Sequence, residues 1–339
     1  MQASATRAGS SAMPLWKKAI RRFFVSAGSD GNLYLWDAAS GRRVKTLRGH
    51  TGWIDSVAIN PRGDLIASAC VADMSVRLWE VESGRCVEIL QAQPGLMEAM
   101  AFSPDGRLLA VGGEFETIWV WDVEARLWFV SLRHTNSVRC VAFNRDGDRL
   151  ASCDDDGIVR VWDARSWNCL LTIQADAEPI WSVYFSPDGC HIVTGSDSAT
   201  IKFWDATTGE CIRTLRDEAD RTWMVSFHPR GHRLLSGGGN STVRVWNLAS
   251  GQIIHRLEGH TAEIRWAIFS HDGRFILTTS NDETMRLWDA ETFECLHTLR
   301  AERPYERMII TDVTGLTEAQ RISLAALGAI DEKRLERSD

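Results

Sequence analysis

Residues 275–289 read FILTTSNDETMRLWD and decide the fold. They contain two strand-like runs, FILTTS and TMRLW, which a short polar turn separates and a Trp-Asp pair closes. Apolar and polar side chains alternate in TMRLW, which is typical of a strand with one buried face. The same pattern recurs along the chain as SVRLW, IVRVW and TVRVW. The sequence therefore predicts a repeat of short antiparallel strands.

The closing tryptophan recurs every 41 to 43 residues, at Trp36, Trp79, Trp121, Trp162, Trp204, Trp246 and Trp288. An apolar run ending in a turn such as SPDG precedes the two strands of each full repeat, and a fourth run such as CIRTL follows the tryptophan. Pro and Gly suit that turn because Pro fixes φ and Gly tolerates positive φ. The pattern predicts an all-β fold, a seven-bladed β-propeller of four-stranded antiparallel blades.

At these residues the chain resembles the WD-repeat β-propellers, over roughly residues 23–315. The resemblance implies a His–Ser/Thr–Asp–Trp hydrogen-bond network, a tetrad, in each complete blade. Three sets of residues match it: His50, Ser68, Asp73 and Trp79; His134, Ser152, Asp156 and Trp162; and His260, Thr278, Asp282 and Trp288. Repeats three, five and six lack the histidine and carry Phe115, Ser198 and Asn240 at the Asp position. We expect faster hydrogen exchange in these three blades, because they lose a buried network.

The two ends of the chain predict how the ring closes. The N-terminal copy lacks its first strand, whereas RMIITDVTG is in phase to begin an eighth copy. We expect residues 306–313 to be the innermost strand of the first blade, since closure removes an exposed sheet edge; residues 15–20 are the alternative. The predicted parts are a disordered leader (1–20), the propeller (21–315), and a short C-terminal helix with a frayed tail (316–339). A transit peptide is the alternative for the leader.

Composition and charge disfavour several classes of function. The chain of 339 residues is 44% hydrophobic and carries a net charge of −7, so nucleic acid is a disfavoured partner. No stretch approaches the ~18–20 apolar residues of a membrane span. Four of the eight cysteines recur at one repeat position, too far apart for disulfides: Cys86, Cys169, Cys211 and Cys295. We expect them to be small buried hydrophobes in a reducing compartment, which indicates the cytoplasm.

No motif predicts catalysis, a cofactor or a metal site. Residues 154–156 are three aspartates, but they lack the spaced ligands of a calcium loop and are predicted to form a hairpin turn. His228 and His232 have H-x-x-x-H spacing but flank a Pro-Arg-Gly turn, so they are not expected to bind a metal. We therefore expect no enzyme, with no catalytic, cofactor-binding or metal-binding residues.

Function is then expected at positions that vary between repeats. In the propellers that this chain resembles, the start of each innermost strand lies at the rim of the central channel. The residues predicted to bind a protein partner there are Trp53, Asp55, Glu98, Arg139, Trp181, Trp223, Arg265 and Arg307. Trp and Arg dominate the energetics of interface centres, which favours this prediction. The alternative is that the tryptophans only pack over a neighbouring blade.

The stretch RPYERMIITDVTGLTEAQRISLAALGAID resembles the segment that ends many bacterial WD-repeat proteins, including signal-transduction NTPases of the NACHT and NB-ARC type. The resemblance implies a bacterial cytoplasmic protein of the sensing or defence type. The chain has no G-x-x-x-x-G-K-[ST] motif, so the effector or NTPase is expected on another chain. The predicted function is a non-catalytic protein-recognition module, a sensor or scaffold subunit. The alternative is a propeller that binds a small ligand, a peptide or nucleic acid in its channel.

Overall fold

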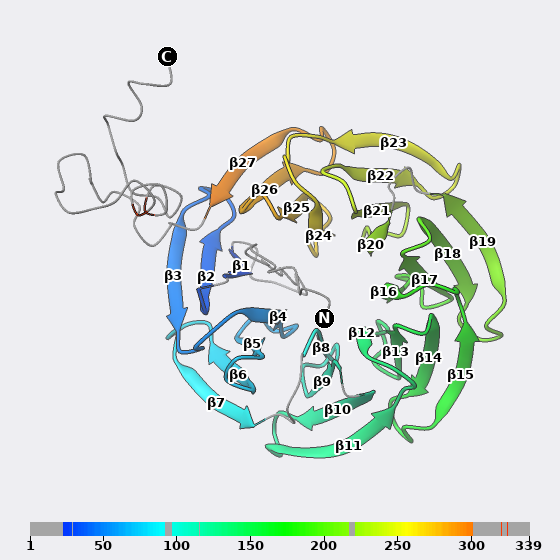
Figure 1. Ribbon diagram of the computed structural model, residues 1–339, viewed down its shortest axis with the longest axis horizontal. Helices are drawn as coiled ribbons and strands as arrows, with labels where there is room; N and C mark the ends of the chain where they lie inside the picture. The colour runs from blue at the N-terminus through cyan, green and yellow to red at the C-terminus, as the bar shows by residue number, and fades with distance from the viewer. Residues whose placement is uncertain are drawn as a thin grey trace. The chain divides into compact units, whose positions relative to one another are not determined.

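The computed structural model describes residues 23–28, 30–91, 97–114, 116–216 and 221–300, together with residues 320 and 324. Contacts divide the chain into two compact units, Met1–Leu299 and Arg300–Asp339. In the first unit, seven sheets follow one another around a ring (Figure 1). In the second, Gln320 and Leu324 are helical. The predicted leader, the predicted closing strand (306–313) and most of the predicted C-terminal helix lie outside the described residues.

Each sheet corresponds to one sequence repeat, with its strands hydrogen-bonded in chain order. Blade one has three described strands, β1 (Phe23–Ala27), β2 (Asn32–Asp37) and β3 (Arg43–Arg48). Blade two consists of β4 (Ile54–Ile59), β5 (Leu65–Cys70), β6 (Ser75–Glu80) and β7 (Cys86–Gln91). Blade three consists of β8 (Ala99–Phe102), β9 (Leu108–Gly112), β10 (Thr117–Asp122) and β11 (Leu127–Arg133). Blade four consists of β12 (Val138–Phe143), β13 (Arg149–Asp154), β14 (Ile158–Asp163) and β15 (Cys169–Gln174).

The remaining blades have the same composition. Blade five consists of β16 (Ile180–Phe185), β17 (His191–Ser196), β18 (Thr200–Asp205) and β19 (Cys211–Arg216). Blade six consists of β20 (Thr222–Phe227), β21 (Arg233–Gly238), β22 (Val243–Asn247) and β23 (Gln252–Leu257). Blade seven consists of β24 (Ile264–Phe269), β25 (Phe275–Ser280), β26 (Thr284–Asp289) and β27 (Cys295–Arg300). The prediction of an all-β, seven-bladed propeller is confirmed.

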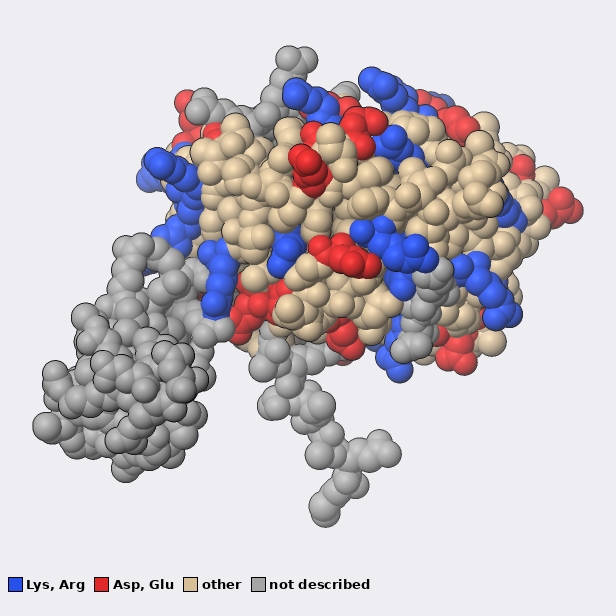
Figure 2. Space-filling view, turned by 90° about the horizontal axis from the view of Figure 1, so that it is seen from above, with Lys and Arg blue, Asp and Glu red and all other residues tan. Residues whose placement is uncertain are grey.

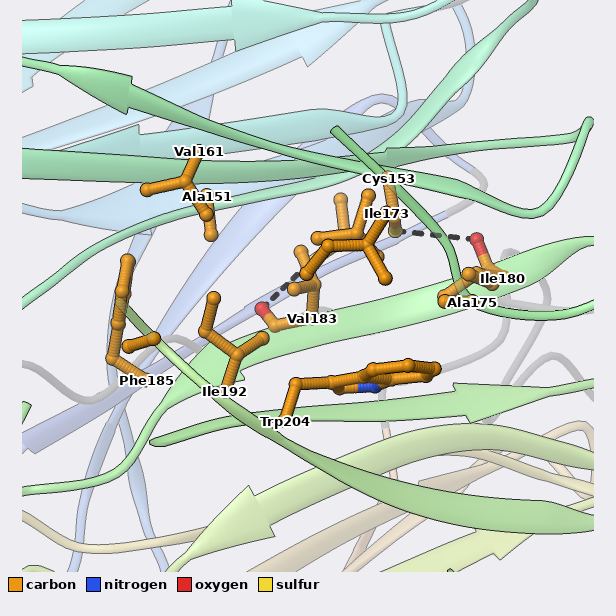
Figure 3. Close-up of a cluster of buried hydrophobic side chains, with 13 residues drawn as sticks. Ala151, Cys153, Val161, Ile173, Ala175, Ile180, Val183, Phe185, Ile192 and Trp204 are labelled. Carbon is orange, nitrogen blue, oxygen red and sulfur yellow. Dashed lines mark hydrogen bonds between the residues drawn. The ribbon is translucent and has the colours of Figure 1, made fainter. Parts of the chain in front are cut away.

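The hydrophobic core lies between neighbouring blades. The cluster between blades four and five joins Cys153 and Val161 of the former to Ile180, Val183 and Trp204 of the latter (Figure 3). The Cys153 thiol donates a hydrogen bond to the Ile180 carbonyl oxygen at 3.2 Å. Since each blade buries its faces against its two neighbours, adjacent repeats stabilise each other.

The first and last blades of the ring also contact each other. The His297 side chain, on β27, donates from Nε2 to the Ala39 carbonyl oxygen of blade one at 3.1 Å. A Cβ atom added at Gly41 would lie 3.0 Å from the His297 ring, and the φ of +65° at Gly41 also favours glycine. Blades one and seven are therefore in direct contact along their outer parts.

A β-bulge precedes the repeat tryptophan where the third strand pairs with the fourth. In blade two, Trp79 pairs with Cys86 and Leu78 with Glu88, which leaves Val87 as the extra residue of β7. The equivalent residues Leu170 and Ile212 are bulged in the same way. Their side chains are exposed, as is that of Val87. Bulges of this kind twist an edge strand and so discourage pairing with other chains.

The same outer strand explains why the prediction of buried cysteines is wrong. Cys169, Cys211 and Cys295 are exposed, and Cys86 is half-buried. Each begins the outermost strand of its blade, where no further strand or blade covers it. All eight thiols are free, with no disulfide among the described residues.

Candidate functional site

The tetrad of blade two is assembled from three separate segments. The Trp79 indole donates from Nε1 to Ser68 Oγ at 2.8 Å, and Ser68 Oγ lies 2.7 Å from His50 Nε2. The other ring nitrogen, Nδ1, lies 2.8 Å from Asp73 Oδ2. Because Asp73 accepts, Nδ1 carries the proton, and Nε2 accepts from the serine hydroxyl. The network therefore ties the strands of the blade to the turn before it.

Blade seven repeats this arrangement, and blade four departs from the prediction at one residue. In blade seven, His260 lies 2.7 Å from Thr278 Oγ1 and 2.8 Å from Asp282 Oδ2, and Trp288 donates to Thr278 Oγ1 at 2.9 Å. In blade four, the residues that contact one another are His134, Ser152, Trp162 and Asp154.

The prediction of Asp156 as a tetrad member is therefore wrong. His134 Nδ1 lies 2.9 Å from Asp154 Oδ2, whereas the exposed Asp156 accepts from the Asn136 side chain. Asp154 is the last residue of β13, as Cys70 is the last residue of β5. Cys70 lies beside His50, the tetrad histidine of blade two, so this strand position is close to the histidine. An aspartate at this position reaches the histidine from the strand itself, so the turn residue is not needed.

Burial determines the titration of the tetrad histidines. Burial lowers the pKa of His134 below its usual range, although the hydrogen bond and charge of Asp154 act in the opposite direction. The pKa values of His50 and His260 are lowered for the same reason. These imidazoles are neutral at pH 7, and their role is to connect strands.

Blade five has an aspartate in place of its missing histidine, and this residue forms a different, partly buried network. Asp176 Oδ2 accepts hydrogen bonds from Ser196 Oγ at 2.9 Å and Ser198 Oγ at 2.8 Å. The Lys202 ammonium group lies 2.9 Å from the same oxygen. Burial alone would raise the pKa of Asp176, but hydrogen bonds from Lys202 and the serines lower it to about 2.

Blades three and six have weaker substitutes for the tetrad. The indole nitrogen of Trp121 in blade three is buried and has no hydrogen-bond partner within the described parts of the chain. In blade six, Trp246 donates to Ser236 Oγ at 2.8 Å, as in the complete tetrads. The Asn240 side-chain oxygen accepts from the Thr242 amide at 3.2 Å and from Arg244 at 3.4 Å. Phe115 lies outside the described residues.

Five of the residues predicted at the channel rim form one continuous row across blades three to seven. We call Glu98, Arg139, Trp181, Trp223 and Arg265 the rim row. The Arg139 guanidinium carbon lies 4.9 Å from the centroid of the Trp181 ring, and that of Arg265 lies 5.4 Å from the Trp223 ring. The two indole rings are 6.3 Å apart and tilted by 57°. Cations therefore flank an aromatic pair on both sides.

Two carboxylates fix one end of the rim row. Arg139 forms ion pairs with Glu98 and with Asp155, the latter through two N–H groups at 2.5 and 2.6 Å. Burial alone would lower the pKa of Arg139, but Asp155 and Glu98 together raise it. Farther along the row, the Trp223 indole donates to Asp197 Oδ1 at 3.2 Å.

Sequence reasoning missed Asp155 and Asp197. Both lie in the turn after the second strand of their blade, and both face the start of an innermost strand. Their signal in the sequence is an acid directly after the end of that strand.

The remaining residues predicted at the rim are Trp53, Asp55 and Arg307. Trp53 is 38% exposed, the only large aromatic side chain of the described residues with an exposure above 36% apart from Phe129. Asp55 accepts a hydrogen bond from the Val71 amide at 3.2 Å, across its own blade. Arg307 lies outside the described residues.

Groups that could bind a metal already have protein partners. His50, Cys70 and Asp73 offer ligand atoms within 4.8 Å of one another, but both nitrogens of His50 belong to the tetrad. The three aspartates of residues 154–156 form a hairpin turn and contact different residues, His134, Arg139 and Asn136. The geometry gives no reason to place a metal ion at either cluster.

His228 and His232 lie close together, with ring centroids 4.2 Å apart. His228 Nδ1 accepts from the Arg230 amide at 3.0 Å, which caps the turn between β20 and β21. Burial, followed by the nearby His232, lowers the pKa of His228 to about 4. This histidine is therefore a turn-capping residue.

The repeats, the tetrads and the ring of blades define a WD-repeat β-propeller, and the family model "WD domain, G-beta repeat" matches residues 251–289. A second family model, "Nucleolar protein 10-like, N-terminal domain", a β-propeller, matches residues 20–237. Because this match covers more than half of the chain, the chain belongs to that family.

Similarity to curated proteins is lower and partial. The nuclear distribution protein PAC1-2 of Uncinocarpus reesii is 28% identical over 173 residues, which cover 44% of this chain and 38% of that protein. The nuclear distribution protein nudF of Aspergillus niger is 28% identical over 142 residues, which cover 42% of this chain and 27% of that protein. The chain thus matches less than half of the length of these relatives. They are fungal, and nothing in the comparisons supports the predicted bacterial tail.

None of the helices in the described part of the chain has the length and hydropathy that a membrane span requires.

Proposed function

We propose that this propeller is a non-catalytic protein-recognition module that binds a protein partner through the rim row. The observation that carries the proposal is the unbroken contact from Arg139 through Trp181 and Trp223 to Arg265. Aromatic and arginine side chains that are already ordered lose little conformational entropy on binding. They are also the residue types that most often dominate interface energetics.

The charge distribution supports a protein partner over a polyanion. Acidic and basic side chains are interspersed on the face that Figure 2 displays, and the net charge of the chain is −7. Nucleic acid binding requires several unpaired cations in one field. In the rim row, Arg139 is instead neutralised by Glu98 and Asp155.

The alternative proposal, a ligand in the central channel, has less support. The cavity between the inner strands is lined by Ala101, Arg139, Tyr184 and Trp266, among others, and has a volume of about 30 Å³. This volume suits one or two water molecules, whereas ligand pockets typically measure about 300–1,000 Å³.

A finer proposal concerns the partner itself, an effector or NTPase subunit of a cytoplasmic signalling or defence assembly in a bacterium. It rests only on the C-terminal resemblance, which lies outside the described residues. The fungal relatives, named as nuclear distribution proteins, give it no support. The propeller and its rim row do not depend on this assignment.

The test is tandem affinity capture with wild-type protein and with the double variant Trp181→Ala/Trp223→Ala. We expect a protein partner whose capture resists added salt and is lost in the folded double variant. A variant with Phe129→Ala is the control for loss of an exposed aromatic side chain outside the predicted rim residues. Steep salt dependence with DNA or RNA, or substrate turnover by the purified chain, would contradict the proposal.

A further inference from the structure

A groove between blades five and six lies at the opposite end of the inner strands from the rim row. Trp181 begins β16, whereas Ser186 and Asp188, which line the groove, follow its end. Strand β16 spans roughly 17 Å between these two ends. The groove has a volume of about 350 Å³, within the range of about 300–1,000 Å³ typical of ligand pockets.

The junction between blades five and six differs from its neighbours at one residue of the groove lining, His191. At the equivalent position of blade four, Arg149 reaches across to blade five and donates to the Ala206 carbonyl oxygen at 2.9 Å. In blade six, Arg233 reaches across to blade seven and donates to the Ala290 carbonyl oxygen at 2.7 Å. His191 stands at the matching position of blade five, and the Leu248 carbonyl oxygen of blade six accepts instead from Arg213 of β19.

The lining of the groove is aromatic and aliphatic. Phe203 and Phe227 meet edge to face, with ring centroids 6.3 Å apart. Phe203 stands where blades four and six have the smaller Val161 and Val245. Ile212, the bulged residue of β19, is 51% exposed at the outer end of the groove. A bulky apolar side chain would therefore find contacts along its whole length.

Arg213 and Arg230 line the edges of the groove, and neither forms an ion pair with a carboxylate of the described residues. Arg230 has no ion-pair partner among the described residues, and Arg213 donates only to the Leu248 carbonyl oxygen. The one acidic residue of the lining, Asp188, already accepts from Ser186 Oγ and from the Cys190 amide. A ligand with carboxylates beside its apolar group would complement both guanidinium groups.

We propose that this groove is a second docking site, which binds an extended acidic segment of a protein and buries one bulky apolar side chain of it against Phe203, Phe227 and Ile212. The inference rests on the proposed protein-recognition function but uses residues outside the rim row. Loss of one site leaves the other intact, so the two proposals fail independently.

The probe is a short fluorescein-labelled peptide with a central phenylalanine between glutamates, titrated by fluorescence anisotropy against the full chain. Two counterparts carry serine in place of phenylalanine or lysines in place of the glutamates. We expect binding of the first peptide and a loss of about tenfold or more with either counterpart. Equal affinity for all three peptides, or no binding of the first, would overturn the proposal.

The decisive variant is His191→Arg, because it introduces the side chain that closes the neighbouring junctions. We expect it to remain folded and to lose about tenfold or more in affinity, although it adds a positive charge. If electrostatic attraction alone bound the acidic peptide, the added positive charge would instead raise the affinity. Phe203→Val introduces the residue that blades four and six have at this position, and it is expected to weaken binding as well.

Arg230→Glu is expected to abolish binding of the acidic peptide. Its matched control is Arg62→Glu, because Arg62 is exposed at the same turn position in blade two. Equal loss in both variants would show that net charge, and not the groove, attracts the peptide. If the His191→Arg variant still captures the protein partner of the rim row, the two sites are independent.

Discussion

The Arg139 guanidinium lies over the Trp181 ring, 4.9 Å from its centroid, while Glu98 and Asp155 hold it from its other sides. The three residues that contact Arg139 come from blades three, four and five. One arginine therefore joins three blades at the channel rim. Its planar guanidinium suits this position, since it can form paired hydrogen bonds and stack on an indole at the same time.

We therefore expect Arg139→Lys to lower the free energy of unfolding by about 1–2 kcal/mol, although it keeps the charge. Lysine can replace neither the paired hydrogen bonds to Asp155 nor the stacking on Trp181. Urea unfolding followed by tryptophan fluorescence measures the change. Arg62→Lys, at an exposed turn, is the control, with an expected change below about 0.5 kcal/mol. Equal effects of the two substitutions would contradict the assigned role.

The aspartates of blade four offer a second test. We expect Asp154→Ala to lower the free energy of unfolding by about 2–4 kcal/mol, because it leaves the buried His134 Nδ1–H and the Ile158 amide without an acceptor. Asp156→Ala removes an exposed carboxylate and is expected to cost less than about 0.5 kcal/mol. Denaturant unfolding of both variants decides between them. A larger effect of Asp156→Ala would restore the tetrad predicted from the sequence.

The fold could be predicted from the sequence because each blade repeats the same pattern and the tryptophan marks its phase. Trp79 and Trp288 are therefore recognisable without knowledge of their surroundings. The contacts of Asp154 were not predictable in this way. Asp156 stands where Asp282 stands in blade seven, in a turn of the same length, and only the structure shows that Asp154 contacts His134 instead.

The rim row could be predicted from aligned strand positions, but its supporting acids could not. Asp155 and Asp197 come from a different turn, and only the packing of blades brings them to Arg139 and Trp223. Asp176 was missed because it is an acidic residue at a position where the repeat pattern has a histidine. The exposure of Cys211 was missed because alternation along a strand does not indicate which strand lies at the edge.

Stability is expected to fall as the pH decreases below neutrality. Burial lowers the pKa of His228 to about 4 from the ordinary 6.5, and it lowers those of the tetrad histidines in the same direction. The unfolded chain therefore binds more protons than the folded chain below pH 6.5. The stabilisation is complete above this pH and is lost progressively as the pH falls toward 4.

Thermal unfolding between pH 7 and 4.5 measures this dependence, and His228→Asn isolates one contribution. Asn60 and Asn144 occupy the same turn position and accept from the backbone at 3.0–3.1 Å, so asparagine is expected to preserve the turn. The variant should show a smaller decrease of the unfolding temperature on acidification. His255→Asn, at an exposed histidine of β23, is the control. An unchanged pH dependence in His228→Asn would contradict the assignment.

The substitute network of blade five predicts the pattern of hydrogen exchange. Because Asp176 accepts from Ser196, Ser198 and Lys202, we expect blade five to be as protected as blades two, four and seven. Blade three should exchange fastest, because the indole nitrogen of Trp121 has no hydrogen-bond partner among the described residues. Asp176→Ala should accelerate exchange in β17 and β18 by about tenfold or more, since it leaves the Lys202 ammonium group without its carboxylate. Mass spectrometry of peptides from each blade measures this, and rapid exchange of blade five in the unaltered protein would contradict the stabilising role of Asp176.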